Sequence, residues 1–289
     1  MHKDKKNVKT DWYGLIFLIM FAVAFEIMMD KGNDEDWFNS VFICRLTVIW
    51  VIGLIGFIIS QIKGKETLVR LNVLSNWNYT MGTICITVMN AILLGSLAMI
   101  PQFMQTMMGY DAYTSGLSMM PRGIGCLIGL LLNKFLPEKT DVRVVASSGI
   151  LLLSIGSWLL GDINLQISQA SIFIPNVLFG IGMTLAMIPL VSFSCLTVDP
   201  KEMSNASGLQ NFIKTIGGAI GTSLVATFIS RFSQIHQFML VKNLTETNNT
   251  YLERLATYAG SFTPSFGIET GNAMAQKLLY NELLQQSRL

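Results

Sequence analysis

The sequence predicts an all-α, polytopic membrane protein with about seven transmembrane helices. Of its 289 residues, 51% are hydrophobic and only 13% are charged, with a mean hydropathy of +0.50. A soluble domain usually carries about 25% charged residues. Three long runs lack any charged residue: Trp12–Phe25, Leu46–Gln61 and Val144–Gly161. Each approaches or exceeds the ~17–20 residues that cross a ~30 Å hydrocarbon core as a helix.

Seven apolar segments with polar connectors between them are expected to form the spans. They cover residues 12–29, 41–62, 79–103, 113–136, 144–161, 170–197 and 212–232. Residues 31–34 and 109–111 have the composition of turns. Before the last span, Asp199 is expected to cap a helix, with Pro200 at its first position and Glu202 completing a capping box.

The spans divide the chain into three regions. Residues 1–11 form a lysine-rich N-terminal segment, residues 12–232 the transmembrane domain, and residues 233–289 a polar tail. Apolar side chains recur at helical spacing between Gly271 and Leu289, which predicts that the tail ends in an amphipathic helix. The stretch of the tail before Gly271 is expected to be an exposed loop.

The charges of the connectors predict the orientation of the chain. Alternate connectors hold only Lys31 as a basic residue and are otherwise acidic. The other set, including the N-terminal segment, is rich in basic residues: Lys3, Lys5, Lys6, Lys9, Lys63, Lys65, Arg70, Lys134, Lys139, Arg143, Lys201 and Lys214. Basic loops stay in the cytoplasm. We therefore expect a cytoplasmic N-terminus, an extracytoplasmic tail and a location in the inner cell membrane.

The composition argues against several other classes of protein. The net charge is +2 and the basic residues do not cluster, which argues against nucleic-acid binding. The two histidines, His2 and His236, lie outside the spans, and the four cysteines lie in different apolar segments, so no metal or cofactor is expected. The spans contain one acid, Glu26, too few for a membrane enzyme. No phosphate-binding GxxxxGK[ST] motif occurs.

Arg122 is the most informative residue of the spans. It lies about nine residues into its span, roughly 13 Å deep at 1.5 Å per residue. An arginine at this depth costs at least ~2.5 kcal/mol unless it is paired or hydrated. It should therefore face the interior of the helix bundle or an aqueous cavity. Two roles remain open: it lines a transport path, or it bonds carbonyls freed by a kink at Pro121.

Glu26 and Arg45 form a second pair of candidates. They lie near the outer ends of the first two spans, which a short corner connects. An interhelical ion pair between them would offset the cost of burying both charges. The alternative is that Glu26 titrates a proton during transport, because an acid in a poorly solvated site has its pKa raised.

Small and polar residues within the spans provide the remaining candidates. Gly217, Gly218 and Gly221 form a face that favours close helix packing, or alternatively bending during transport. Pro121 and Pro189 interrupt the helical hydrogen bonds of their spans. The polar side chains of Asn90 and Gln102 are expected either to line a cavity on the transport path or to bridge helices.

Three stretches resemble the 14-helix drug:proton antiporters of the major facilitator superfamily, the EmrB/QacA type. The first contains Phe25–Gly32 and Asp36–Phe38, and resembles the outer corner after the family's seventh helix. The second contains Ser115–Leu117, Met120–Gly125 and Asp141–Arg143, and resembles the tenth helix and the following loop. The third contains Pro200–Glu202, Asn205–Leu209, Asn211–Phe212 and Gly217–Ser223, and resembles the region after the twelfth helix.

The resemblance covers nearly the whole chain as helices seven to thirteen of fourteen. It implies half of a major facilitator fold, lacking the N-terminal half and the last helix, and a proton-coupled multidrug efflux permease. It also implies amphipathic small-molecule substrates in a lipid bilayer, and as partner a matching N-terminal half or a periplasmic adaptor. The alternative is a truncated product that does not transport, or an assembly partner of a separate N-terminal half.

Overall fold

The computed structural model describes residues 11–63, 71–136, 141–161, 169–241 and 249–287. These residues are helical and contain no strand. Seven helical segments are long and apolar enough to cross a membrane, which confirms the expected number of spans. The chain is a multi-pass membrane protein. It divides into two compact units, residues 1–105 with 110–224, and residues 106–109 with 225–289.

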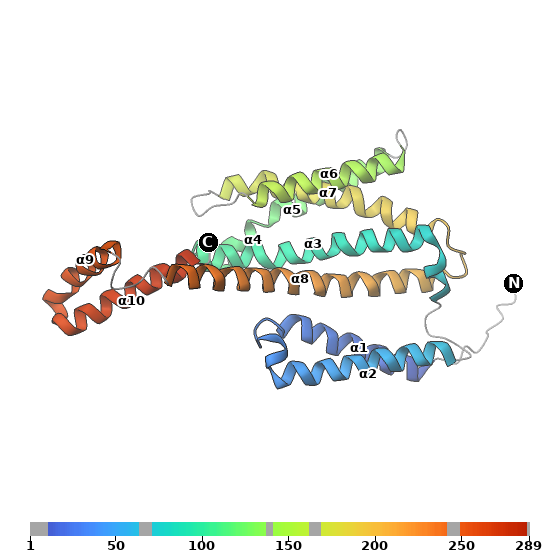
Figure 1. Cartoon of the computed structure of the whole chain (residues 1–289). Helices are drawn as coiled ribbons and strands as arrows, with labels where there is room; N and C mark the ends of the chain where they lie inside the picture. Colours follow the sequence, from blue (N-terminus) through green and yellow to red (C-terminus); the bar gives the residue numbers. More distant parts are fainter. Residues whose placement is uncertain (1–10, 64–70, 137–140, 162–168, 242–248, 288–289) are drawn as a thin grey trace. The chain divides into compact units, whose positions relative to one another are not determined.

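The first unit begins with two helices packed as a hairpin, α1 (Trp12–Lys31) and α2 (Val41–Lys63), joined through the short 3₁₀ helix η1 (Trp37–Asn39) (Figure 1). Close packing is possible because Gly53 has no side chain. A Cβ atom there would lie 2.7 Å from the backbone nitrogen of Phe21. The thioether of Met28 accepts hydrogen bonds from Thr47 and Trp50, which fixes the rotation of the two helices relative to each other.

Asp11 joins the N-terminal end of α1 to the C-terminal end of α2. Its carboxylate accepts hydrogen bonds from the backbone N–H of Gly14, at 2.8 Å, and from the hydroxyl of Ser60 on α2, at 2.7 Å. The first bond caps α1, because it satisfies one of the free N–H groups of the first turn. Both hydrogen bonds stabilise the charged carboxylate and lower the pKa of Asp11, and the bond from Ser60 has the larger effect.

We expect Asp11→Ala to lower the free energy of unfolding by about 1 kcal/mol, the usual value of a helix cap. Because the pKa of Asp11 is lower in the folded state, its contribution is present above the pKa of the unfolded chain. It is lost as the pH falls through the lower, folded-state pKa. Unfolding in detergent at neutral and acidic pH measures both effects. Equal stability of the variant and the wild type at neutral pH would contradict this prediction.

The remaining helices of the first unit pack in pairs through glycines. After η2 (Leu71–Ser75), α3 (Trp77–Met107) is followed by the interrupted span α4 (Ala112–Leu117) and α5 (Met120–Phe135). Next come α6 (Val142–Gly161) and α7 (Gln169–Cys195), which lie side by side in Figure 1. A Cβ atom on Gly149 would lie 2.5 Å from the backbone of α7. A core of Met89, Leu153, Phe179, Met183 and Ala186 joins α3, α6 and α7.

The span containing Pro121 is divided into two helices. A kink at Pro121 within one continuous helix was expected, but α4 ends at Leu117 and α5 begins at Met120. Pro121 lies in the first turn of α5, where the N–H group that proline lacks would have had no helical partner. The turn between the helices is closed by hydrogen bonds from the N–H of Met119 to Gly116 and from that of Arg122 to Met119.

Helix α8 (Met203–Val241) is longer at both ends than the span expected from the sequence. It begins at Met203 because the carboxylate of Asp199 accepts a hydrogen bond from Lys201 and closes a turn, while the carbonyl of Glu202 accepts the first helical bond from Ala206. Pro200 therefore lies in the turn before the helix. At its other end α8 passes the expected boundary at residue 232 and reaches Val241.

The second unit contains a helical hairpin, α9 (Asn249–Phe266) and α10 (Ile268–Ser287). Helix α10 lies where the amphipathic helix was expected, whereas α9 occupies a stretch that was expected to be a loop. Gly267 has a φ of +80°, which allows the sharp reversal between them. The hydroxyl of Tyr258 donates to the carboxylate of Glu282 at 2.8 Å across the hairpin.

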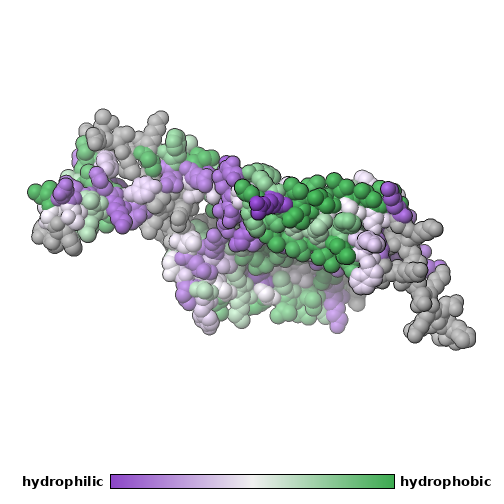
Figure 2. Space-filling model, turned by 90° about the horizontal axis from the view of Figure 1, so that it is seen from below, coloured by the Kyte–Doolittle hydropathy of each residue, from purple (hydrophilic) through white to green (hydrophobic). Residues whose placement is uncertain are grey.

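The exposed surfaces of the two units differ in character. Hydrophobic side chains gather over α1 and α2 in Figure 2, whereas α9 and α10 show a mixture of hydrophilic and hydrophobic residues. Large apolar side chains such as Ile16, Ile52 and Ile59 are exposed on the first two helices. An outer surface of this kind is suited to lipid. The N-terminal segment expected over residues 1–11 lies outside the described residues, apart from Asp11.

Candidate functional site around Arg122

Arg122 lies buried in the first turn of α5, with 4% of its surface exposed. Its Nε donates a hydrogen bond to the Oδ1 atom of Asn176 on α7, at 3.1 Å. Its Nη1 donates to the hydroxyl of Ser96 on α3, at 3.0 Å. The guanidinium carbon lies 4.0 Å from the centre of the Phe179 ring, within the range of a cation–π contact. Side chains of α3 and α7 therefore hold the cation that α5 carries.

The two residues that accept these hydrogen bonds are themselves held in place. The amide nitrogen of Asn176 donates to the carbonyl oxygen of Ile172, at 3.1 Å, and to that of Ser118, at 3.5 Å. This turns its oxygen toward Arg122. The hydroxyl of Ser96 donates to the carbonyl of Leu93, at 2.9 Å, and so offers its lone pairs to the guanidinium. The two acceptors are therefore preorganised to bind the guanidinium.

Glycines bring the backbones of α5 and α7 close together beside this cluster. A Cβ atom on Gly180 would collide with the carbonyl oxygen of Arg122 itself, and one on Gly125 with the carbonyl oxygen of Val177. The short separation allows the side chain of Arg122 to reach Asn176 and Phe179 on the neighbouring helix. Small residues have this role in many membrane helix pairs.

The positive charge of Arg122 faces neutral groups in the part of the chain that the structure describes. There, one ion pair occurs, between Lys31 and Asp34 on the surface, at 3.7 Å. The Nη2 atom of Arg122 is buried and has no hydrogen-bond partner among the described residues. The guanidinium remains protonated at neutral pH. The site is thus a buried cation with unused hydrogen-bonding capacity.

The sequence predicted that Arg122 faces the bundle interior, and the structure places it there. Its hydrogen bonds go to side chains of α3 and α7 rather than to carbonyls freed near Pro121. Sequence reasoning did not identify Ser96, Asn176 and Phe179 as its partners. A polar residue in an apolar segment was the available signal for Asn176, but nothing local connects it to a residue 54 positions away.

Asn90 and Gln102 both lie on α3, but one is buried and the other is exposed, and neither contacts Arg122 through a hydrogen bond described above. Asn90 is buried on α3 and donates to the carbonyl oxygen of Lys214 on α8, at 3.0 Å. It therefore bridges two helices, one of the two roles expected for it. The side chain of Gln102 is exposed near the other end of α3.

The structure does not form the ion pair expected between Glu26 and Arg45. Both side chains are exposed, and their helices are neighbours with the wrong faces toward each other. At 100° per residue, Glu26 is turned about 200° from the buried Met28. Arg45 is turned by the same angle from the buried Ile43 of α2. The side chains that face the partner helix are apolar or uncharged.

The three glycines of α8 lie against α3. A Cβ atom on Gly217 would collide with Thr87, one on Gly218 would lie 2.8 Å from the amide of Asn90, and one on Gly221 would lie 2.5 Å from the carbonyl of Ala91. They therefore permit close packing of the two helices. Pro189 lies within α7, which continues through it.

A buried polar cluster that sequence reasoning missed lies between α3, α7 and α8. The amide nitrogen of Gln210 donates to the hydroxyls of Ser194, at 2.8 Å, and Thr83, at 3.3 Å. Nearby, the hydroxyl of Tyr79 donates to the carbonyl oxygen of Ala206, at 2.7 Å. These bonds join the three helices, and their donors and acceptors are uncharged.

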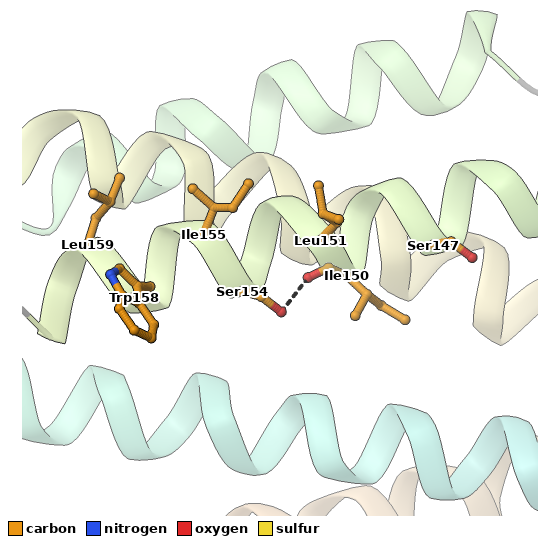
Figure 3. A pocket seen from close by; sticks show the side chains of 7 residues that line it. All are labelled: Ser147, Ile150, Leu151, Ser154, Ile155, Trp158 and Leu159. Atoms are coloured by element: carbon orange, nitrogen blue, oxygen red, sulfur yellow. Dashed lines mark hydrogen bonds between the residues drawn. The ribbon is translucent and has the colours of Figure 1, made fainter.

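A hollow on the surface of α6 contains no charged side chain in its lining (Figure 3). Apolar side chains form most of its lining. The hydroxyls of Ser147 and Ser154 donate to carbonyls of their own helix, at 2.8 and 2.9 Å. Within the described ranges, no three His, Cys, Asp or Glu side chains come together in a way that could hold a metal ion. The Arg122 cluster is therefore the strongest candidate site.

A comparison of the sequence with known protein families shows to which family the chain belongs. A model described as the Major Facilitator Superfamily matches residues 12–222. The chain belongs to the major facilitator superfamily. The matched part of this major facilitator contains the whole Arg122 cluster and ends just before residues 225–289, which form most of the second unit. The match thus covers the first six spans and the beginning of the seventh.

Individual relatives agree with this assignment. The chain is 30% identical to the probable multidrug resistance protein EmrY of Escherichia coli K12, over 96% of this chain and 54% of the relative. It is 26% identical to the multidrug export protein EmrB of the same strain, over 83% and 47%. It is 25% identical to the fatty acid resistance protein FarB of Neisseria gonorrhoeae, over 99% and 55%. The chain spans about half the length of the curated relatives it matches.

Proposed function

We propose that this chain supplies the C-terminal helices of a proton-coupled efflux permease for amphipathic compounds in the inner membrane. Membership of the superfamily and similarity to proteins named for multidrug export and resistance support a transporter. The observation that carries the proposal is the buried Arg122 cation, held within a candidate membrane span by side chains of α3 and α7. Charged groups inside membrane spans usually serve transport or proton relay.

Transport in this proposal uses alternating access, in which this set of helices rocks against a matching N-terminal half. Arg122 lines the path and changes its surroundings as the halves move. Glu26, which is exposed, lies within the first span and is a candidate for proton coupling. Gly217, Gly218 and Gly221 let α8 slide or bend against α3. The second unit lies on the outer side of the membrane, where a periplasmic adaptor could contact it.

Efflux of ethidium from cells tests this function. We expect no efflux from cells with this chain alone, and efflux when a matched N-terminal half is produced with it. Arg122→Lys should lower efflux several-fold, normalised to the amount of protein in the membrane, because lysine lacks the planar fork of five donors. Arg45→Lys, at an exposed arginine, should not. Absence of efflux with both halves present in the membrane would reject the proposal.

The coverage of only about half of each relative favours a second candidate function. In that case the chain assembles with a separate N-terminal half and does not transport by itself, or is a product without transport activity. Purification of this chain with a tagged N-terminal half distinguishes the two. Co-purification together with efflux supports the transporter, and co-purification without efflux supports the assembly partner.

The charges of the connectors predict the orientation within the membrane. We expect residue 34 to be extracytoplasmic and residue 141 to be cytoplasmic. Asp34→Cys and Asp141→Cys, each in a background without the four native cysteines, can be treated with an impermeant thiol reagent in intact cells. Labelling should occur at position 34 and not at position 141. The reverse pattern would overturn the orientation. Lys139, which belongs to the same expected cytoplasmic loop, lies outside the described residues.

A further inference from the structure

We propose that Arg122 binds a carboxylate group, and that the permease therefore accepts amphipathic acids. This inference rests on the proposed function, since it names the class of substrate for that same site. The carboxylate comes either from a transported molecule or from an acidic side chain of the matching N-terminal half. The chemistry at Arg122 is the same in both cases.

The first argument is the charge of the cluster. Burying an ion costs several kcal/mol, and burial is usually offset by an opposite charge. The partners of Arg122 are a neutral amide, a neutral hydroxyl and an aromatic ring. These groups orient the cation but do not neutralise it. An anion is the group that would complete the site.

The second argument is the geometry of the unused donor. Nε and Nη1 are each bonded to a side chain, and the Phe179 ring lies against the guanidinium. This leaves Nη2, which carries two N–H donors, without a partner among the residues that the structure describes. A planar oxyanion meets an arginine in the plane of its donors, so a carboxylate matches the two unused donors of Nη2 in chemistry.

The third argument is the apolar wall beside the cation. Phe179 belongs to the buried core that also contains Met89 and Met183. Methionine and aromatic side chains adapt to varied apolar molecules. A ligand with its carboxylate on Arg122 would place its apolar part near these side chains. An uncharged ligand of the same shape lacks the attraction to the cation, which is strong where water is excluded.

Access to the site depends on movement of the helices. The Nη2 atom is covered by protein in this structure. The cluster joins α3 to α5 and α7 through a hydrogen bond to one hydroxyl, that of Ser96. Separation of α3 from the other two helices would expose the donors while Asn176 continues to hold the guanidinium. The rocking motion of alternating access provides such a separation.

Equilibrium dialysis of 2-naphthoate against the purified chain in lipid nanodiscs tests the proposal, with empty nanodiscs as the blank. The reference compound, dialysed separately, is 2-naphthamide, which has nearly the same shape and no charge. We expect the acid to bind the wild type at least tenfold more tightly than the amide. Arg122→Gln should weaken binding of the acid by roughly ten- to a hundredfold, as expected for a lost charged hydrogen bond. Arg45→Gln should leave it unchanged.

Equal binding of acid and amide by the wild type would overturn the proposal, and this result does not depend on whether any variant folds. Equal binding of the acid by Arg122→Gln and Arg45→Gln, in folded protein, would also overturn it. Binding needs no transport, so these results are independent of the ethidium efflux that tests the proposed function.

A second arm of the experiment identifies the source of the carboxylate. The same dialysis is repeated with the matched N-terminal half bound to the chain. If the carboxylate comes from the substrate, 2-naphthoate still binds and still requires Arg122. If it comes from the other half, binding of 2-naphthoate is lost, and co-purification of the halves falls in Arg122→Gln and not in Arg45→Gln. Loss of 2-naphthoate binding without an effect of Arg122→Gln on co-purification would reject both sources.

Discussion

Asn176→Ala is expected to lower the free energy of unfolding by about 3 kcal/mol. The substitution removes the acceptor for the Nε atom of Arg122 and leaves a buried cation with one fewer partner. A hydrogen bond to a charged group contributes about 1.5–3 kcal/mol, and an unpaired buried charge adds to the loss. Unfolding of the purified chain in mixed micelles with an increasing fraction of denaturing detergent measures the difference in the free energy of unfolding between variant and wild type.

A matched substitution and a double mutant make this prediction specific. Asn90→Ala also removes a buried asparagine that bonds across helices, but its partner is the neutral carbonyl of Lys214. It should cost only about 1 kcal/mol. When Arg122→Met is combined with Asn176→Ala, the total loss should be smaller than the sum of the two single losses, because the cation that needed the acceptor is gone. Additive losses would show that the two side chains are not coupled.

Gly125→Ala and Gly123→Ala are expected to change stability in opposite directions, although both residues lie on α5. A Cβ atom on Gly125 would collide with the backbone carbonyl of Val177, so α5 and α7 must move apart. We expect a loss of about 2–3 kcal/mol from overpacking. No atom lies within 4 Å of a Cβ atom on Gly123. There alanine should stabilise the helix by roughly 0.5–1 kcal/mol, because it has less conformational freedom to lose.

The same unfolding measurement compares the two glycine variants. Efflux with the matched N-terminal half adds a second readout, since separation of α5 from α7 would also displace Arg122 from Asn176. Gly125→Ala should therefore lose both stability and normalised efflux, and Gly123→Ala should lose neither. A stable Gly125→Ala variant would show that the two helices do not pack as closely as the structure has them.

The sequence predicted the interior position of Arg122 because the cost of exposing a guanidinium to lipid is a property of the residue and its depth. It also predicted that the first two spans are neighbours. It did not predict which of their side chains meet. Glu26 and Arg45 lie at comparable heights on adjacent helices, but the rotation of each helix turns them away from the interface. Met28, Thr47 and Trp50 make the contact instead.

The tail shows a similar difference between periodicity and packing. Apolar spacing after Gly271 indicated the helix now seen as α10. The preceding stretch forms a second helix, α9, although it was expected to be a loop. Its buried Ala259 and the hydrogen bond from Tyr258 to Glu282 belong to the contact with α10. Most of the stability of such a helix comes from packing against its neighbour.

The sequence by itself determined the number of spans, their approximate bounds and the need of Arg122 for an interior position. A helix in lipid satisfies its backbone hydrogen bonds within one segment, so local hydropathy suffices to locate it. Only the tertiary structure decided that Arg122 meets Ser96, Asn176 and Phe179, and that Nη2 has no partner among the residues that the structure describes. Those contacts depend on how whole helices rotate and approach one another, which is set by packing between residues far apart in the chain.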